Sequence, residues 1–249
     1  MKLIWLMGYL FFLTACSLDE IKPDGQKSQL VLIESVSLEV PEPSGLTLNN
    51  GANALYVVSD PPDNSVYKLD LLGNVKRVLS YSGGDLEGIS YDHRDHTLWV
   101  AEESLREVVH LDTLGNELER FSINFEGTSS SSGFEGILLN PVTNHIVLLN
   151  EKSPGTFIDL DSSMNITLEY ALDFALDYSG ICFNTTDGNY FIVSDESQEL
   201  IEWNFEKRII RSFSLDYEKA EGVAYNPETN RIYIVSDSEQ KLYIYEFQH

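Results

Sequence analysis

Basic residues are scarce in this chain. Lysine and arginine together number 16 in 249 residues, against 40 aspartates and glutamates, so the formal net charge at pH 7 is −24. A chain of this charge repels nucleic acids and anionic lipid headgroups, and neither is expected as an electrostatic partner. The composition therefore argues against nucleic-acid binding.

Cysteine is almost absent and histidine is rare. The two cysteines are Cys16 and Cys182, and if Cys16 is lipidated, as argued below, no intrachain disulfide is possible. Cys182 lies between two apolar residues, which favours a small core residue over a nucleophile. The five histidines show no spacing typical of metal ligands, and no Gly-x-Ser-x-Gly elbow occurs. A zinc site built on His or Cys and a serine nucleophile are therefore both disfavoured.

Long apolar runs are absent except near the first residue. Lys2 precedes an apolar run at 4–13, which ends in Leu-Thr-Ala followed by Cys16. This pattern is typical of a secretory signal and is too short for a spanning helix. Small residues before a cysteine also resemble the bacterial lipobox, which predicts cleavage before Cys16 and a diacylglyceryl chain on its sulfur. The alternative is an ordinary signal peptide with a chance cysteine.

The first 29 residues are accordingly interpreted as two segments. Residues 1–15 are the predicted lipoprotein signal peptide, and residues 16–29 are a lipidated cysteine followed by a flexible polar tether. Loss of Lys2 would leave 15 basic against 40 acidic residues. Asp19-Glu20 loosely resembles the export tags of bacterial surface lipoproteins. We therefore expect lipid anchoring in the cell envelope, at the outer membrane or cell surface rather than the inner membrane.

The rest of the chain repeats one pattern five times. A glycine preceded by Ser or Glu opens each repeat, and an acidic residue follows the glycine at a constant spacing of 15 positions. The five segments are 44–60, 87–103, 135–151, 179–195 and 221–237.

Each repeat has the composition of antiparallel strands. A short apolar run after the glycine leads into a turn rich in Asn, Asp, Gly and Pro, and a β-branched and aromatic run follows. A third strand comes next, and in the first two repeats a Leu-Gly-Asn turn leads to a fourth. The sequence therefore predicts an all-β, five-bladed β-propeller of four-stranded blades over residues 30–249. The last repeat stops after its third strand, so the run at 29–40 is expected to supply the fourth and close the ring.

Two sets of acids are predicted to meet at one mouth of the central channel. In a blade the innermost strand lines the channel and the second runs antiparallel beside it, so the start of the first and the end of the second lie together. The first set precedes the repeat glycines and consists of Glu87, Glu135 and Glu221, with Ser44 and Ser179 in the other two blades. The second set ends the second strands and consists of Asp60, Glu103, Glu151, Asp195 and Asp237. A serine-rich loop at 124–133 is a candidate rim for the same mouth.

Converging carboxylates repel one another, at about 3 kcal/mol for charges ~5 Å apart at an effective dielectric of ~20. Basic residues near these positions are few, and none is expected to pair with Glu87, Glu102 or Glu103. Either some carboxyls are protonated or a cation lies among them, and oxygen ligands favour Ca²⁺ over Zn²⁺. For the second set, capping of a tight turn is an alternative role. The first set is harder to explain in that way, because Ser replaces Glu in two repeats.

The chain resembles a known family. The runs EPSGLTL, DLEGISY and LWVAEES resemble the SdiA-regulated family of bacterial envelope propellers, which is related to phytase-like, esterase-like and NHL-type propellers. The resemblance covers essentially all of 30–249. It implies a five-bladed propeller with a Ca²⁺ site, carried here onto Glu87, Glu135 and Glu221 with the second acidic set in support.

Two functions of different classes follow. The first is a lipid-anchored, calcium-binding module that presents its acidic mouth to a small ligand or a protein partner, as a monomer. The alternative is a calcium-dependent hydrolase of a phosphoester, a lactone or another ester, in which a channel glutamate serves as general base. The scarcity of Lys and Arg disfavours a polyanionic phosphate as the substrate.

Overall fold

The computed structural model describes residues 29–125 and 133–248. The predicted signal peptide, Cys16, all but the last residue of the tether and most of the serine-rich loop lie outside the described residues. Within the described part, no helix is both long and apolar enough to cross a membrane.

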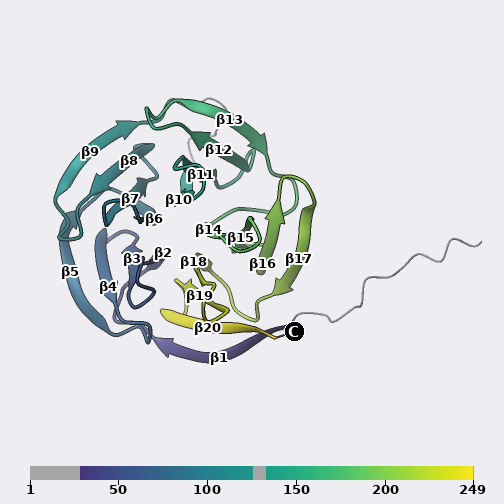
Figure 1. Ribbon diagram of the computed structural model, residues 1–249. Helices are drawn as coiled ribbons and strands as arrows, with labels where there is room; N and C mark the ends of the chain where they lie inside the picture. Colours follow the sequence, from purple (N-terminus) through teal and green to yellow (C-terminus); the bar gives the residue numbers. More distant parts are fainter. Residues whose placement is uncertain (1–28, 126–132, 249) are drawn as a thin grey trace, which may run out of the picture.

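Twenty strands form five four-stranded antiparallel sheets, arranged as blades around a central channel (Figure 1). The prediction of an all-β, five-bladed propeller is confirmed. The first two blades, from the innermost strand outward, are β2 (Pro43–Leu48), β3 (Leu55–Ser59), β4 (Ser65–Leu69) and β5 (Val75–Ser82), then β6 (Leu86–Asp92), β7 (Thr97–Glu102), β8 (Glu107–Leu111) and β9 (Glu117–Ser122).

The third and fourth blades have the same order. They are β10 (Phe134–Leu139), β11 (Ile146–Asn150), β12 (Thr156–Leu160) and β13 (Ile166–Ala171), then β14 (Gly180–Asn184), β15 (Asn189–Ser194), β16 (Glu199–Asn204) and β17 (Arg208–Ser214). The sequence pattern had indicated fourth strands only in the first two repeats. β13 and β17 escape it because outer strands are largely exposed and carry little apolar signal.

The fifth blade closes the ring. It contains β18 (Ala220–Asn226), β19 (Arg231–Ser236), β20 (Lys241–Gln248) and, outermost, β1 (Gln29–Ser37). β1 pairs antiparallel with β20 from Gln29 opposite Gln248 to Ser37 opposite Lys241, and the two lie side by side in Figure 1. The predicted closure by the run at 29–40 is confirmed, and it protects the edge of β20 from pairing with other chains.

The core consists of apolar side chains packed between neighbouring blades. One cluster joins Leu46 and Val57 of the first blade to Tyr233 and Val235 of the fifth, and four similar clusters fill the other junctions. The second strands are almost entirely buried, as in β3 and β11. Each blade is therefore held mainly by its neighbours, which makes the closed ring the unit of stability.

The turn between the first and second strands is capped by a side chain at the same repeat position in every blade. Four residues after each repeat glycine, a side-chain oxygen accepts a backbone N–H of the turn at 2.9–3.0 Å, two residues on in four blades and four residues on in the first blade. The capping residues are Asn49, Asp92, Asn140, Asn184 and Asn226. These Asx turns shape the end of the channel opposite the predicted acidic mouth.

The repeat glycine is required by the close approach of inner strands. A Cβ on Gly222 would lie 2.3 Å from the carbonyl oxygen of Ser44 and 2.5 Å from the amide nitrogen of Leu46 in the first blade. Both atoms belong to backbone, which cannot move aside. Gly136 is less constrained, because its nearest neighbour is a terminal carbon of Leu149 at 3.1 Å.

Candidate metal centre

A β-bulge turns each glutamate of the first set into the channel mouth. Leu86 pairs with Glu102 and Gly88 pairs with Ala101, so Glu87 is the extra residue in its strand. Glu135 and Glu221 occupy the same place in β10 and β18. In regular pairing, the glutamate and the glycine beside it would face opposite sides of the sheet, and the bulge removes that constraint.

Five carboxyls of the first three blades gather at this mouth. Ligand oxygens of Glu87, Glu103 and Glu135 lie within 4.8 Å of one another, and so do those of Asp60, Asp85 and Glu87. Glu87 belongs to both groups and connects them. Of these residues, Asp85 was not assigned from the sequence. The signal for it was the Asp-Leu-Glu-Gly run, in which Asp85 adopts a left-handed conformation with φ of 66°.

Glu87 is the most deeply buried member of the cluster. Its exposed fraction is 8%, and the Ser44 hydroxyl donates to its carboxylate at 2.7 Å and to its backbone carbonyl at 2.8 Å. Burial, followed by the negative charge of Asp60, raises the pKa of Glu87 far above its usual range. Ser44 therefore orients this carboxyl without neutralising it.

Asp60 is the clearest sign of a missing positive charge. Its Oδ1 is buried and has no hydrogen-bond partner among the described residues. Burial raises the pKa of Asp60, and a carboxyl oxygen of Asp60 lies within 4.8 Å of one of Glu87. Two carboxyls buried this close together favour a proton or a cation between them. The donor set consists of oxygen atoms alone, which fits a hard cation such as Ca²⁺.

Glu135 extends the cluster toward the third blade. Solvent reaches part of its side chain, but burial and the charges of Glu87 and Glu221 raise its pKa well above the usual range. Burial, followed by Asp85 and Glu151, raises the pKa of Glu103. No lysine or arginine pairs with Glu87, Glu103 or Glu135 in the described chain.

The opposite side of the mouth is partly neutralised by Lys219. Its Nζ lies 3.4 Å from Asp195 and 3.6 Å from Glu221, and its backbone N–H donates to Asp195 at 2.6 Å. Burial raises the pKa of Glu221 to about 7, while Lys219 opposes this shift. Asp237 lies farther round, where burial and then Glu42, a residue that the sequence had not suggested, raise its pKa.

Glu151 is also paired. Lys152 contacts its carboxylate at 2.5 Å and that of Glu196 at 2.9 Å. The structure thus brings all eight predicted acids to one mouth but divides them. The predicted acids of the first two blades and Glu135 have no basic partner within the described residues. Glu151, Asp195 and Glu221 each have one.

Glu102 corrects one expectation. It was expected to lack a basic partner, yet it is 1% exposed and accepts from Arg120 at 2.7 Å and from the Tyr81 hydroxyl at 2.6 Å. The hairpin from β8 to β9 brings Arg120 back across the blade, which the distance along the sequence had hidden. Glu102 therefore stabilises the blade and is not part of the mouth.

The turn-cap alternative for the second set applies only in part. The serine before the acid does the local capping, since Ser194 Oγ accepts the Ser197 N–H at 3.1 Å and Ser236 Oγ accepts the Glu239 N–H at 3.4 Å. The Asp195 carboxylate accepts the backbone N–H of Lys219, which lies in the loop that leads into the fifth blade. The acids of this set are therefore not caps of their own turns.

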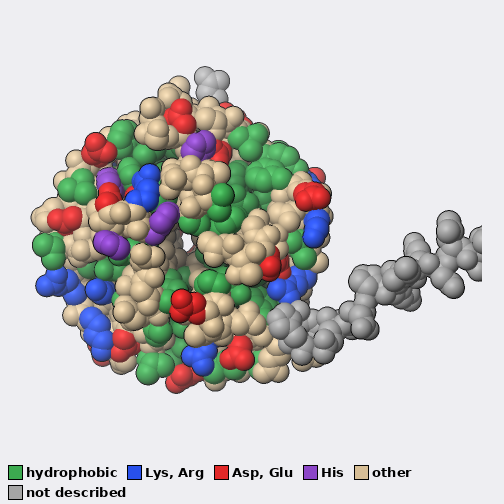
Figure 2. Space-filling model, in the orientation of Figure 1, with side chains coloured by type: hydrophobic (Ala, Val, Ile, Leu, Met, Phe, Trp, Pro, Cys, Tyr) green, Lys and Arg blue, Asp and Glu red, His purple; other side chains and the backbone are tan. Residues whose placement is uncertain are grey.

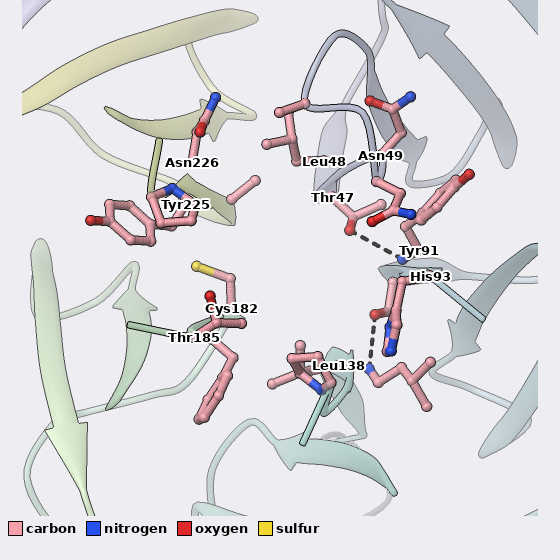
Figure 3. Close-up of a pocket in the computed structure, with 18 of the residues that line it drawn as sticks. Thr47, Leu48, Asn49, Tyr91, His93, Leu138, Cys182, Thr185, Tyr225 and Asn226 are labelled. Atoms are coloured by element: carbon pink, nitrogen blue, oxygen red, sulfur yellow. Dashed lines mark hydrogen bonds between the residues drawn. The ribbon is translucent and has the colours of Figure 1, made fainter. Parts of the chain in front are cut away.

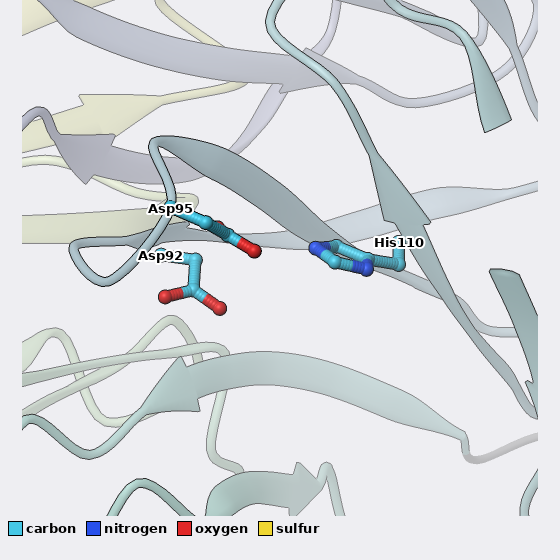
Figure 4. A group of neighbouring side chains, drawn as sticks. All are labelled: Asp92, Asp95 and His110. Atoms are coloured by element: carbon cyan, nitrogen blue, oxygen red, sulfur yellow. The ribbon is translucent and has the colours of Figure 1, made fainter. Parts of the chain in front are cut away.

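A second group of possible ligands lies on the opposite end of the second blade. Asp92, Asp95 and His110 come together there (Figure 4), although histidine spacing in the sequence gave no sign of it. However, Arg94 contacts both oxygens of Asp92, and the indole N–H of Trp99 donates to it at 3.1 Å. His110 Nε2 lies 2.6 Å from the Thr97 hydroxyl. These groups already satisfy one another, so this cluster is structural.

Comparison with known proteins places the chain in a family. The SdiA-regulated family model matches residues 31–247, and the chain belongs to this family. Among solved structures, the chain is similar to glutaminyl cyclase from Myxococcus xanthus, with a TM-score of 0.68 and 11% identity over 89% of this chain and 97% of that one. It is also similar to a protein of unknown function from Bacteroides caccae, with a TM-score of 0.50 and 11% identity over 74% and 65% of the two chains. At such identities the likeness shows the fold alone. No curated protein matches the chain.

Proposed function

We propose that this member of the SdiA-regulated family is a calcium-binding module whose acidic mouth receives a small ligand or a protein partner. The observation that carries the proposal is the approach of the Asp60 and Glu87 carboxyls to within 4.8 Å, beside a buried oxygen of Asp60 that has no hydrogen-bond partner among the described residues. Asp60, Asp85, Glu87, Glu103 and Glu135 would hold the ion. They offer enough oxygen atoms for the six to eight ligands that Ca²⁺ takes.

The residues around this centre favour binding at the mouth. When bound, the ion supplies a positive charge that attracts and polarises an oxygen of the ligand. Ser44 holds Glu87 in position from the first blade, and the closed ring fixes the strands that carry the other acids. A rigid, preorganised mouth of this kind lowers the entropy cost of binding a ligand.

The alternative is a calcium-dependent hydrolase. It is favoured by Glu135, whose carboxyl adjoins that of Glu87 and could carry a proton to or from a reacting oxygen. A propeller of similar fold is a glutaminyl cyclase, so the architecture is compatible with catalysis. Lys152 and Lys219 are already engaged with carboxylates, which leaves an ester or lactone better suited than a phosphoester.

Hydrolysis can be tested with p-nitrophenyl acetate and bis-p-nitrophenyl phosphate in the presence of Ca²⁺. Turnover above the rate of the Glu135→Gln variant would favour the enzyme. If the wild type and Glu135→Gln hydrolyse both substrates at equal rates, the result would favour the binding module over the enzyme.

Calcium titration calorimetry of residues 29–249 tests the metal proposal. We expect at least one Ca²⁺ per chain and a loss of about tenfold or more in affinity for Glu87→Gln, because Glu87 belongs to both groups of ligands. Glu151→Gln is the matched control, since Glu151 is neutralised by Lys152. Equal affinity in the wild type and Glu87→Gln would exclude the site.

We further propose that Cys16 carries the lipid that anchors this module to the bacterial envelope, at the outer membrane or cell surface. The sequence pattern around Cys16 supports this proposal. Metabolic labelling with palmitate should mark the wild type and not Cys16→Ser, and only the wild type should sediment with membranes. Membrane retention of unlabelled protein would contradict it.

A further inference from the structure

The end of the channel opposite the acidic mouth is hollowed into a cavity of about 310 Å³ (Figure 3). We call it the neutral mouth. The second residue after each repeat glycine lines it, so every blade contributes one side chain: Thr47, Ser90, Leu138, Cys182 and Ala224. The capped turns between first and second strands form its walls. Its volume lies at the lower end of the range of small-molecule sites, about 300–1,000 Å³.

The neutral mouth is separated from the acidic mouth. At the level of the repeat glycines the channel narrows to a space of about 10 Å³, lined by those glycines, by apolar neighbours such as Ile89, and on the acidic side by Glu135 and Ser179. A space of this size holds one water at most. A ligand at one mouth therefore cannot touch groups at the other.

Charge distinguishes the two mouths even more clearly. The lining of the neutral mouth includes one carboxylate, Glu228, and no lysine or arginine. Histidines lie in or beside these turns, as His93 and His145 do, so Figure 2, with histidine side chains near the central opening, looks onto this face. In a chain of net charge −24, such a site selects against charged ligands.

The cavity has a polar side and an apolar side. Thr47 Oγ1 accepts the Tyr91 N–H at 3.1 Å, and Ser90 Oγ accepts the Leu139 N–H at 2.8 Å, each from the next blade. Both hydroxyl oxygens are fixed in this way, while no acceptor for either hydroxyl hydrogen occurs in the described chain. Each of the two neighbouring blades thus offers the cavity one hydroxyl that is free to donate. Leu138, Cys182 and Ala224 form the apolar side, where the half-buried Cys182 lines the cavity and also packs against the core cluster of the fourth and fifth blades, as expected for a small core residue.

We propose that the neutral mouth binds a small, uncharged carbonyl compound with an apolar body. The carbonyl oxygen accepts from the hydroxyls of Thr47 and Ser90, and the body packs against the side chains of the third, fourth and fifth blades. Two donors that converge on one acceptor provide orientation, while the apolar side provides area for burial. This site is independent of calcium and of the acidic mouth.

The neutral fluorescent ketone Prodan is a suitable probe, with residues 29–249, which include every strand of the ring. We expect saturable binding of one probe per chain, with a blue-shifted emission. Ser90→Ala should weaken it by about three- to tenfold, because one hydrogen bond to the ketone is lost. Ser90→Thr, which places at this position the residue found at 47, should bind like the wild type. Cys182→Trp, which fills the apolar side, should abolish saturable binding.

Two controls keep the test decisive. Thr143→Val removes a hydroxyl from an exposed turn on the same face outside the cavity, and Glu103→Gln alters the acidic mouth; both should bind Prodan like the wild type. Circular dichroism at the assay temperature identifies any variant that fails to fold, in which case Leu138→Trp replaces Cys182→Trp. Wild-type affinity in Ser90→Ala, a larger loss in Glu103→Gln, or an absence of saturable binding would overturn the proposal.

Discussion

At the scale of single residues, the acidic mouth depends on how its carboxyls are neutralised. Glu221 and Asp195 share Lys219, and Glu151 has Lys152. Glu87 and Asp60 have no basic partner among the described residues, and burial disfavours the charge of both. Within the described residues the deficit of positive charge is thus local to one side of the mouth, which is where we place the ion.

Glu135→Gln should separate metal binding from folding. The substitution keeps the shape of the side chain but removes an ionisable group whose charged form is disfavoured by burial and by the charges of Glu87 and Glu221, which raise its pKa. Without metal, we expect the free energy of unfolding to rise by about 1 kcal/mol, since a repulsive contact is lost. Calcium affinity should fall at the same time. Urea unfolding in EGTA measures the first effect, and a variant less stable than the wild type there would contradict the account.

The pH dependence of stability without metal should have an unusual sign for a carboxylate. Burial raises the pKa of Glu221 to about 7, above the unfolded value of about 4.3. Such a group stabilises the fold fully below its unfolded pKa, and this contribution is lost as the pH rises through the folded pKa. The melting temperature in EGTA should therefore fall between pH 5 and pH 8, and fall less in Glu221→Gln. A melting temperature that rises over this range would refute the assignment.

Residues of the mouth were predictable where the repeat marked them. The eight acids occupy fixed places relative to the glycines, so strand order alone placed them together. Asp85 and Glu42 each lie three residues before a repeat glycine, but this position is glycine or lysine in two other repeats, so the sequence showed no regular acid there, and the fold brings the two near Glu87 and Asp237. Arg120 was missed as the partner of Glu102 for a similar reason, because a hairpin joins them.

At the scale of elements, the bulge that places the glutamate before the repeat glycine in the second, third and fifth blades is the feature that the sequence could not reveal. Alternation along a strand predicts that Glu87 and Gly88 face opposite sides. The extra residue in β6, β10 and β18 lets the glutamate enter the mouth, while the glycine still allows close packing of inner strands. The spacing of the repeat in the sequence shows that the glutamate recurs beside the glycine, but it does not show the extra residue that turns the glutamate into the mouth.

The two kinds of repeat glycine should respond differently to alanine. In Gly222→Ala the new Cβ would meet backbone atoms of the first blade, so we expect a loss of about 3 kcal/mol in unfolding free energy. In Gly136→Ala it would meet a leucine methyl that can move, and the loss should stay within about 1 kcal/mol. Denaturant unfolding of both variants measures the difference. Equal losses would show that strand proximity is not the reason for the glycine.

At the scale of the whole molecule, the closed ring both stabilises the blades and forms the channel with its two mouths. The pairing of β1 with β20 completes the fifth blade, and each blade in turn supports its neighbours. The channel that results has one acidic and one neutral mouth, with a narrow passage at the repeat glycines between them. The five-fold repeat thus carries two chemically distinct sites on one scaffold.

Removal of β1 should weaken the entire propeller. A chain that begins at residue 38 leaves the edge of β20 unpaired and loses Leu30, so the apolar cluster against which Leu30 packs, which includes Tyr245 and Phe247, becomes more exposed. We expect a melting temperature at least about 10 °C below that of residues 29–249, together with aggregation through the open edge. Differential scanning fluorimetry and light scattering measure both. Equal melting temperatures would show that closure contributes little.

The most direct test of the calcium proposal is the thermal unfolding of residues 29–249 in EGTA, in millimolar Ca²⁺ and in millimolar Mg²⁺. If the mouth holds Ca²⁺, at a concentration of about 100 times Kd the ion should add about 2.7 kcal/mol to the stability of the fold. For a domain of this size, that corresponds to a rise of roughly 5–10 °C in the melting temperature. Mg²⁺ should give a much smaller rise, and Glu87→Gln should lose most of the effect. No shift with Ca²⁺, or the same shift in Glu87→Gln, would contradict the account.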